Sequence, residues 1–217
     1  MKVLYTDNHL FVVRKPAGML VQGDRTGDTS LFDHARKQIK DKFNKPGNVY
    51  LGLVHRLDRP TSGVVVFALT SKAAKRLSEQ FRVGSVRKIY WALVEGKTPP
   101  DGTLIDRIHR HGPTSHIAKG NSGQRAELSF RRLQYDKGVS WVEIELATGR
   151  HHQIRVQFSH RGYPVIGDFR YGSKIKFGQK ALALHARSLT INHPTRKEEM
   201  TFVAGLEPFW PRQFRTL

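Results

Sequence analysis

The sequence of 217 residues contains no cysteine. Without cysteine the chain can form no disulfide, no thiol nucleophile and no zinc site that needs a thiolate ligand. It is also poor in acidic residues, with 18 Asp and Glu against 37 Lys and Arg, so its formal net charge is +19. A positive excess of this size attracts polyanions, and nucleic acid is the most abundant polyanion in cells. The composition therefore favours nucleic acid as the partner, with a membrane surface as the weaker alternative.

Long hydrophobic runs are absent as well. No stretch approaches the roughly eighteen apolar residues of a membrane span, and Asp7, Asn8 and His9 interrupt any signal-peptide pattern near the amino terminus. We therefore expect a cytoplasmic protein with no membrane partner. Hydrophobic residues still make up 38% of the chain, which is enough for a folded interior. No Walker loop or Gly-x-Gly-x-x-Gly motif is present, so the sequence gives no support for nucleoside triphosphate or dinucleotide chemistry.

Strand patterns outnumber helix patterns, and most of them follow one another without an intervening helix. We expect strands at residues 3–5, 10–14, 51–54, 64–69, 89–94, 125–133, 139–146, 182–191 and 200–204. The valine-rich run at 64–69 is typical of a strand buried on both faces. We expect helices at 31–43, after Thr70 or Ser71, and at 151–161, and a solvent-exposed excursion at 106–125. The first helix begins with a capping box, Ser30-Leu31-Phe32-Asp33, and carries an apolar stripe at helical spacing that runs from Leu31 to Phe43. This pattern predicts an α+β fold, a large mixed, mainly antiparallel sheet flanked by helices and loops, with a cleft across the sheet. With no repeat or linker, we interpret residues 1–217 as one catalytic domain, in one lobe or two.

The loop from His55 to Gly63 carries the most unusual local pattern. Asp58 lies between Arg56 and Arg59 in a chain that is poor in carboxylates. Positive neighbours favour the ionised form of a carboxylate, and a fixed, ionised aspartate can be a nucleophile, a base or a metal ligand. An aspartate that caps a turn or forms a structural ion pair gives the same pattern. Local composition alone gives these two interpretations about equal weight.

Two further segments could carry chemistry. At 148–155, Gly149 allows a tight turn into a helix whose free N–H groups can meet a phosphate, and Arg155 shares a helix face with His151. A solvated basic helix end would give the same pattern, and the adjacent histidines do not form a zinc pair. Along the strand at 89–94, alternation sends Tyr90 to one face and Ile89 and Trp91 to the other. A tyrosine facing a polar cleft can stack on a base, although a strand tyrosine is by default part of the core.

Taken together, six motifs resemble those of the RluA-type pseudouridine synthases, which isomerise chosen uridines in structured RNA. The segment His55-Arg56-Leu57-Asp58-x-x-Thr61-Ser62-Gly63 resembles the signature loop of that family. The other five motifs occur in the family's order: Lys15-Pro16-Ala17-Gly18, Lys88-x-Tyr90, Thr148-Gly149-Arg150-x-His152-Gln153-Ile154-Arg155-Val156, Gly167-Asp168-x-x-Tyr171-Gly172 and Leu184-His185-Ala186. The resemblance covers roughly residues 3–204.

The resemblance implies a role for four residues. Asp58 would be the catalytic aspartate, Arg155 the arginine that pairs with it, Tyr90 the aromatic ring that stacks on the target uracil, and Arg56 the residue that helps to extrude the nucleotide. The implied reaction breaks the uridine C1′–N1 bond, rotates the uracil and reattaches it through C5. Such an isomerisation requires no cofactor and no metal. Asp58 would attack C1′ or remove a 2′ proton, and the sequence does not choose between these routes.

Some features depart from the family pattern. Gln157 and Gln22 stand where histidine is common. Both changes could alter RNA contacts rather than the central chemistry, and the sequence does not decide their effect. Many relatives carry an amino-terminal RNA-binding domain of the S4 type, whereas this chain enters its first expected strand by Val3, so we expect no S4 domain and a monomer. A tRNA or rRNA stem-loop, or both, would then be recognised by the catalytic body itself, the helix at 31–43 or the excursion at 106–125.

Two rival functions remain open from the sequence. A non-catalytic basic RNA-binding protein would explain the charge, but it gives no reason for Asp58 and Arg155 together. A metal-dependent nuclease would use Asp58 with Asp168 or histidines, yet the sequence shows no carboxylate cluster for Mg²⁺.

Overall fold

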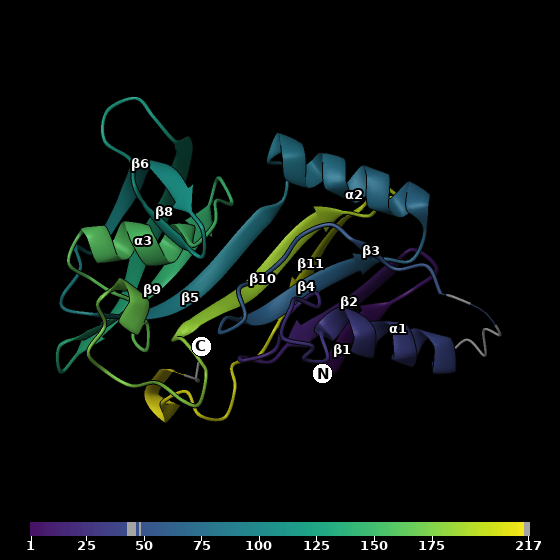
Figure 1. Cartoon of the computed structure of the whole chain (residues 1–217), viewed down its shortest axis with the longest axis horizontal. Helices are drawn as coiled ribbons and strands as arrows, with labels where there is room; N and C mark the ends of the chain where they lie inside the picture. Colours follow the sequence, from purple (N-terminus) through teal and green to yellow (C-terminus); the bar gives the residue numbers. More distant parts are fainter. Residues whose placement is uncertain (43–46, 48, 215–217) are drawn as a thin grey trace. The chain divides into compact units, whose positions relative to one another are not determined.

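The computed structural model describes residues 1–42, 47 and 49–214 (Figure 1). In this part of the chain there are three α-helices and eleven strands, and the strand pairs are mostly antiparallel. The predicted α+β fold on a large, mainly antiparallel sheet is therefore confirmed. The chain divides into two compact units, a first unit of Met1–Val86 with Ala186–Gly205 and a second unit of Arg87–His185 with the carboxy-terminal segment from Leu206.

The first unit is built on six strands in the order β1-β2-β4-β10, with β3 paired to β4 and β11 paired to β10. Their bounds are β1 Lys2–Thr6, β2 Leu10–Lys15, β3 Gly52–Leu53, β4 Ser62–Ala68, β10 Leu184–Asn192 and β11 Glu199–Val203. Two helices, α1 Leu31–Lys42 and α2 Ser71–Val83, accompany them (Figure 1).

The two helices pack on opposite faces of β4. Alternate residues of β4, Val64 and Val66 among them, share a hydrophobic core with Leu77 of α2. Phe67 points to the other face, where its ring centroid lies 6.0 Å from that of Phe32 in α1. Every residue of β4 is buried, which confirms the prediction that this valine-rich run is covered on both sides.

Side chains at the helix ends explain where α1 and α2 begin and end. Ser30 and Asp33 form the predicted capping box, in which the Ser30 hydroxyl donates to Asp33 Oδ2 over 2.6 Å. Thr70 accepts the N–H of Ala73 at the start of α2, and Gly84 ends that helix in the left-handed conformation at φ 76°. The predicted continuation of the α1 stripe to residue 43 lies outside the described residues.

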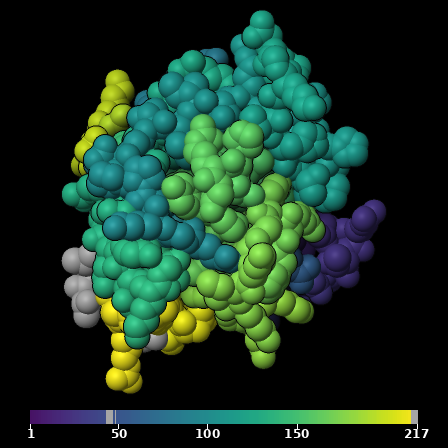
Figure 2. Space-filling view, turned by 90° about the vertical axis from the view of Figure 1, so that its left-hand side faces the viewer, coloured from purple at the N-terminus to yellow at the C-terminus, as the bar shows by residue number. Residues whose placement is uncertain are grey.

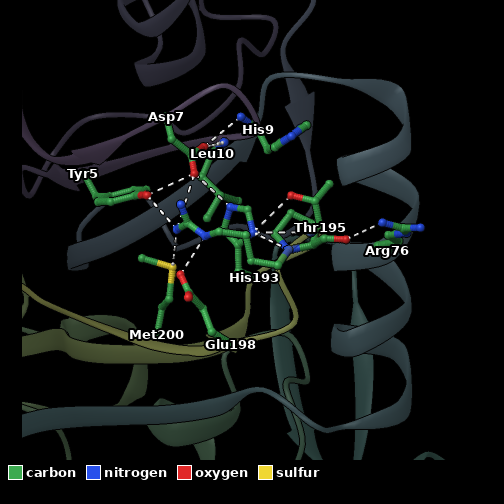
Figure 3. Close-up of polar contacts among 11 residues, drawn as sticks. Tyr5, Asp7, His9, Leu10, Arg76, His193, Thr195, Glu198 and Met200 are labelled. Atoms are coloured by element: carbon green, nitrogen blue, oxygen red, sulfur yellow. Dashed lines mark hydrogen bonds and ion pairs between the residues drawn. The ribbon is translucent and has the colours of Figure 1, made fainter.

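A polar cluster joins the β1–β2 turn to the β10–β11 turn (Figure 3). Asp7 Oδ1 accepts the N–H groups of His9 and Leu10 at 2.8 and 2.7 Å. Its Oδ2 accepts from the Tyr5 hydroxyl at 3.0 Å and lies 2.8 Å from Nε2 of the buried His193. One carboxylate therefore holds two turns that are far apart in the sequence.

We expect Asp7→Asn to lower the free energy of unfolding by about 1–3 kcal/mol at pH 7, because the amide cannot accept all four hydrogen bonds. Burial opposes ionisation, but the hydrogen bonds from His9, Leu10 and Tyr5 outweigh it and lower the pKa of Asp7. Because the pKa of Asp7 is lower in the folded protein, ionised Asp7 stabilises the fold at pH values above the ordinary pKa of 3.8. This stabilisation is lost as the pH falls through the folded-state pKa.

Urea unfolding between pH 7 and pH 2 tests this prediction. The stability difference between wild type and Asp7→Asn is constant near neutrality and shrinks below pH 3.8. Asp101→Asn is the matched control, because Asp101 is exposed at the start of a strand. Equal stability of Asp7→Asn and wild type at pH 7 would contradict the role assigned to the cluster.

The second unit consists of five antiparallel strands in the order β5-β9-β8-β6-β7. Their bounds are β5 Arg87–Glu95, β6 Asp101–His111, β7 Thr114–Ile117, β8 Gln124–Asp136 and β9 Val139–Leu146. Helix α3, Gln153–His160, packs on one face, where the Phe158 ring lies 5.3 Å from that of Phe130 in β8. Two short 3₁₀ helices follow, η1 Phe169–Tyr171 and η2 Arg212–Phe214.

The prediction for residues 106–125 was right in part. Most of these residues are exposed to solvent, as expected, but the segment is not an irregular excursion, because β6, β7 and the start of β8 form regular antiparallel pairs across it. Apart from the exposed Ile105, the outward positions of β6 are polar. Only Leu104 and Ile108 mark the buried face of this strand. The helix predicted at 151–161 is present as α3, and because all residues from Gln153 to Phe158 are buried, the alternative of a solvated basic helix end is excluded. None of the described helices is long and apolar enough to cross a membrane.

Candidate active site

The predicted signature loop lies in the first unit, between β3 and β4. Arg56 is exposed, Leu57 is buried and Asp58 is half-buried. The Asp58 carbonyl accepts the N–H of Thr61 at 3.0 Å, which closes the turn after the aspartate. At the start of the loop, His55 Nε2 accepts the N–H of Val66 at 3.0 Å. The loop is therefore fixed at both ends, and Asp58 is accessible on a defined backbone.

Lys15 holds this loop through a hydrogen bond to its backbone. It is a lysine with no exposed surface. Its ammonium donates to the carbonyl oxygens of Pro16, Met19 and Arg59 at 3.0, 2.8 and 3.0 Å. Three acceptors satisfy all three N–H donors of the ammonium, which makes its burial tolerable. Lys15 is thus a positioning residue for the Asp58 loop. Sequence reasoning noted the motif that contains Lys15 but missed this role.

Gly63 ends the signature loop where the backbone leaves no room for a side chain. Its φ is +125°, and an added Cβ would lie 2.3 Å from the carbonyl oxygen of Ala186 in β10. Two of the motifs, the signature loop and Leu184-His185-Ala186, therefore meet in space. Their small residues permit a close approach of two backbones.

We expect Gly63→Ala to lower the free energy of unfolding by about 3 kcal/mol or more, because it adds both backbone strain and a steric clash. Gly23→Ala is the matched control, since nothing lies within 4 Å of a Cβ there and its φ is not positive. Denaturant midpoints of the two variants give the comparison. Equal midpoints would show that the contact with Ala186 is not rigid.

Tyr90 lies in the second unit, on the face of the sheet that carries α3. It is in register with Ile144 of β9, which is in register with Phe130 of β8, and Phe130 packs against α3. Trp91 points to the opposite face, where its indole N–H donates to Glu143 at 3.2 Å. The predicted division of β5 into two faces is confirmed. Tyr90 is half-buried and shares its sheet face with the helix of Arg155.

Arg155 projects from α3 into a buried ion pair with Asp168. Its Nε and Nη2 donate to the two carboxylate oxygens of Asp168 at 2.6 and 2.9 Å. The side chains are only 6% and 2% exposed, so this is a desolvated bidentate pair. Asp168 was not predicted as a partner of Arg155. Its motif, Gly167-Asp168-x-x-Tyr171, was the available signal.

The predicted partner of Arg155, Asp58, belongs to the other unit, and their pairing stays a prediction. Tyr171 lies against the Arg155–Asp168 pair, with the Arg155 guanidinium carbon 5.0 Å from its ring centre. The Tyr171 hydroxyl accepts the N–H of Ser115 at 2.8 Å and shares a hydrogen bond of 2.8 Å with His152 Nδ1. Burial raises the pKa of Tyr171, so its hydroxyl stays neutral. These contacts connect η1 to β7 and to the start of α3.

The motif at 148–156 folds differently from the expected glycine turn. Residue 149 has no positive φ, whereas His152 adopts the left-handed conformation at φ 56° before α3. Gln153 Oε1 accepts from the Thr148 hydroxyl at 2.7 Å and from the Arg150 N–H at 2.9 Å. The motif therefore orients the start of α3, and His151 lies outside the helix, so it does not share a helix face with Arg155.

Gln157 lies in the interior of the second unit. Its side chain is fully buried and donates to Asp106 Oδ2 at 2.7 Å, and the same carboxylate pairs with Arg161 at 2.9 Å. Its side chain does not reach the surface, so any effect of this departure on RNA contacts is indirect. Gln22, by contrast, is exposed.

Lys88 adds positive charge to the sheet face of Tyr90. Burial lowers the pKa of its ammonium, and the nearby Arg150 guanidinium lowers it further. A half-buried lysine beside the exposed Arg150 guanidinium favours an anionic ligand such as a phosphate. Within the described ranges, no three His, Asp or Glu side chains are grouped in a way that could hold a metal ion.

Comparison with known proteins gives consistent results. A family model described as RNA pseudouridylate synthase matches residues 9–160. The chain is 34% identical to the ribosomal large subunit pseudouridine synthase D of Pseudomonas aeruginosa, over 95% of this chain and 68% of that protein. It is 35% identical to the dual-specificity RNA pseudouridine synthase RluA of Haemophilus influenzae, over 94% of this chain and 92% of that protein.

Solved structures show the same similarity. The human RNA pseudouridylate synthase domain containing 4 superposes with a TM-score of 0.80 at 26% identity, over 96% of this chain and 89% of that chain. The human RNA pseudouridylate synthase domain containing 1 gives a TM-score of 0.75 at 28% identity, over 97% and 84% of the two chains.

Proposed function

Because the chain belongs to the RNA pseudouridylate synthase family, we propose that it modifies folded tRNA or rRNA and uses Asp58 as its catalytic carboxylate. The enzyme is an isomerase that converts uridine in RNA into pseudouridine. Relatives named for tRNA, for the large ribosomal subunit and for dual specificity support a tRNA or rRNA stem-loop as substrate. The net charge of +19 supports binding of such a polyanion.

The observation that carries the role of Asp58 is its place on a fixed loop. Lys15, His55 and Gly63 hold the backbone on both sides of the aspartate, while its side chain is only half-buried. A carboxylate that must meet a sugar carbon needs this combination of accessibility and defined position. Asp58 either attacks C1′ as a nucleophile or removes the 2′ proton as a base, and both routes use its ionised form.

The isomerisation conserves the atoms of the nucleotide. The C1′–N1 bond breaks, the uracil rotates, the C1′–C5 bond forms, C5 loses its proton and N1 gains one. No electrons are exchanged with another molecule, so the reaction requires neither a redox partner nor a nucleotide cofactor. The ionised carboxylate of Asp58 supplies the negative charge that either route to breaking the glycosidic bond requires.

Three other residues complete the proposed site. Arg56 is exposed beside Asp58 and is free to enter the RNA as the target nucleotide is extruded. Tyr90 is half-buried near the cationic Lys88 on its sheet face, which suits a ring that stacks on uracil beside a phosphate. Arg155, held by Asp168, supplies a fixed guanidinium for the carboxylate of Asp58.

We further propose that the enzyme acts as a monomer in the cytoplasm. Light scattering of the purified chain measures its oligomeric state.

A catalytic role distinguishes the protein from a passive RNA-binding protein, since its family performs an isomerisation. A nuclease would instead cleave the RNA and depend on a divalent metal.

Mapping pseudouridines in the tRNA and rRNA of cells with and without the gene tests the proposed function. We expect one or a few stem-loop positions to lose the modification in the deletion strain. Wild-type enzyme restores these positions, and the Asp58→Asn variant does not. An unchanged map in the deletion strain, or restoration by Asp58→Asn, would contradict the proposal.

A further inference from the structure

The most exposed large apolar side chain beside the proposed site is Phe169, the first residue of η1. It is 62% exposed, whereas the preceding residue, Asp168, is almost completely buried. An exposed phenylalanine contributes little to the core, and water disfavours its ring. Its ring is therefore available for contact with a ligand.

The backbone on both sides of Phe169 is rigidly held. Asp168 is fixed by Arg155, and Tyr171 is fixed by Ser115 and His152. The Ser159 hydroxyl also donates to the Tyr171 carbonyl at 2.6 Å. The ring of Phe169 is thus presented on a fixed turn, which reduces the entropy that is lost when a ligand stacks on it.

Two exposed arginines connect the segment of Phe169 to the β6–β7 turn: Arg170 follows Phe169 in η1 and contacts the turn, and Arg110 belongs to the end of β6 at that turn. Arg170 Nη1 donates to the Pro113 carbonyl at 2.8 Å, and Arg110 Nε donates to the Gly112 carbonyl at 3.1 Å. In the part of the chain that the structure describes, neither arginine has a carboxylate partner. Figure 2 shows the teal β6–β8 region beside the green segment that contains η1 on one face of the molecule. The carbonyl contacts orient both guanidinium groups and leave their other N–H groups available.

We propose that Phe169 stacks on an unpaired base of the RNA substrate, outside the catalytic site, while Arg110 and Arg170 bind the neighbouring phosphates. The proposal rests on the proposed function, because it assigns a second contact to the same RNA. An aromatic ring flanked by cations that have no acidic partner matches the way proteins bind single-stranded nucleic acid. A hydrophobic protein partner would gain nothing from two guanidinium groups beside the ring.

The test compares two short probes, an oligouridine and an abasic oligonucleotide of the same length and charge. We expect Phe169→Ala to weaken binding of the oligouridine by about 5–150-fold, the range that corresponds to loss of one stacked base. Binding of the abasic probe stays unchanged, because that probe has no base to stack. Phe169→Tyr keeps wild-type affinity. Ile105→Ala is the matched control, an apolar residue of β6 that is 51% exposed and lies outside the patch.

The arginines give a different signature. Arg170→Met and Arg110→Met weaken binding of both probes, and each reduces the slope of log affinity against log salt concentration by about 0.7. The two probes therefore measure separately the contribution of the ring, which contacts a base, and that of the guanidinium groups, which contact phosphates.

Two outcomes would overturn the inference. If Phe169→Ala weakens the binding of both probes equally, the ring has only a structural role. If it weakens the binding of neither probe, the patch serves another partner such as a protein. Pseudouridine formation, measured in parallel, separates this inference from the proposed function. We expect Phe169→Ala to raise KM with little change in kcat. If wild type binds oligouridine through Phe169 but forms no pseudouridine, the proposed function fails while the stacking contact stands.

Discussion

Asp58→Asn will reduce turnover by at least about 10²–10⁴-fold and leave RNA affinity unchanged or slightly higher. Asparagine keeps the shape of the side chain but cannot act as an anionic nucleophile or base. It also removes a negative charge that repels phosphate. Tritium release from RNA labelled at uridine C5 measures turnover, because C5 must lose its hydrogen. Filter binding of the same RNA measures affinity.

A second aspartate variant controls for the loss of charge alone. Asp41→Asn removes an exposed carboxylate from α1, and we expect it to release tritium at the wild-type rate. Residual activity of Asp58→Asn within tenfold of wild type would show that another group is the catalytic carboxylate.

Arg155→Met will lower the free energy of unfolding by about 3–5 kcal/mol, because it leaves the Asp168 carboxylate buried without its cation. We also expect a severe loss of activity, since Asp58 loses the guanidinium proposed to pair with it. Denaturant unfolding and tritium release measure the two effects. A variant as stable and as active as wild type would contradict both assignments.

A double variant separates the structural and functional roles of Arg155. In the Arg155→Met background, Asp168→Asn removes the uncompensated charge, and we expect it to restore much of the lost stability. It should not restore turnover, because the contact with Asp58 is still missing. Recovery of activity together with stability would show that Arg155 acts only through the fold.

The sequence was most informative where structure is determined by neighbours in the chain. The capping box at Ser30 and Asp33 and the valine run of β4 follow from local spacing, and both are confirmed. The hairpin of β6 and β7 was missed because most of its side chains point to solvent. Its polar composition is typical of a loop, and the strands are recognised only through their pairing partners.

The candidate site shows the same division. The motifs located Asp58, Tyr90 and Arg155 in the sequence, because each motif is a short continuous segment. The contacts that position them join distant residues, such as Lys15 with the Arg59 carbonyl and Arg155 with Asp168. No local pattern encodes such a pair, so the roles of Lys15 and Asp168 emerged only from the fold.

The central claim is tested most directly by incubating the purified chain with RNA from cells that lack the gene, in the presence of a chelator and without any added cofactor. Nucleoside chromatography with mass spectrometry distinguishes pseudouridine from uridine, which has the same mass. The account predicts that wild-type enzyme forms pseudouridine while the RNA stays intact and that the Asp58→Asn variant forms none. Absence of pseudouridine with wild type, equal formation by the variant, or cleavage of the RNA would contradict it.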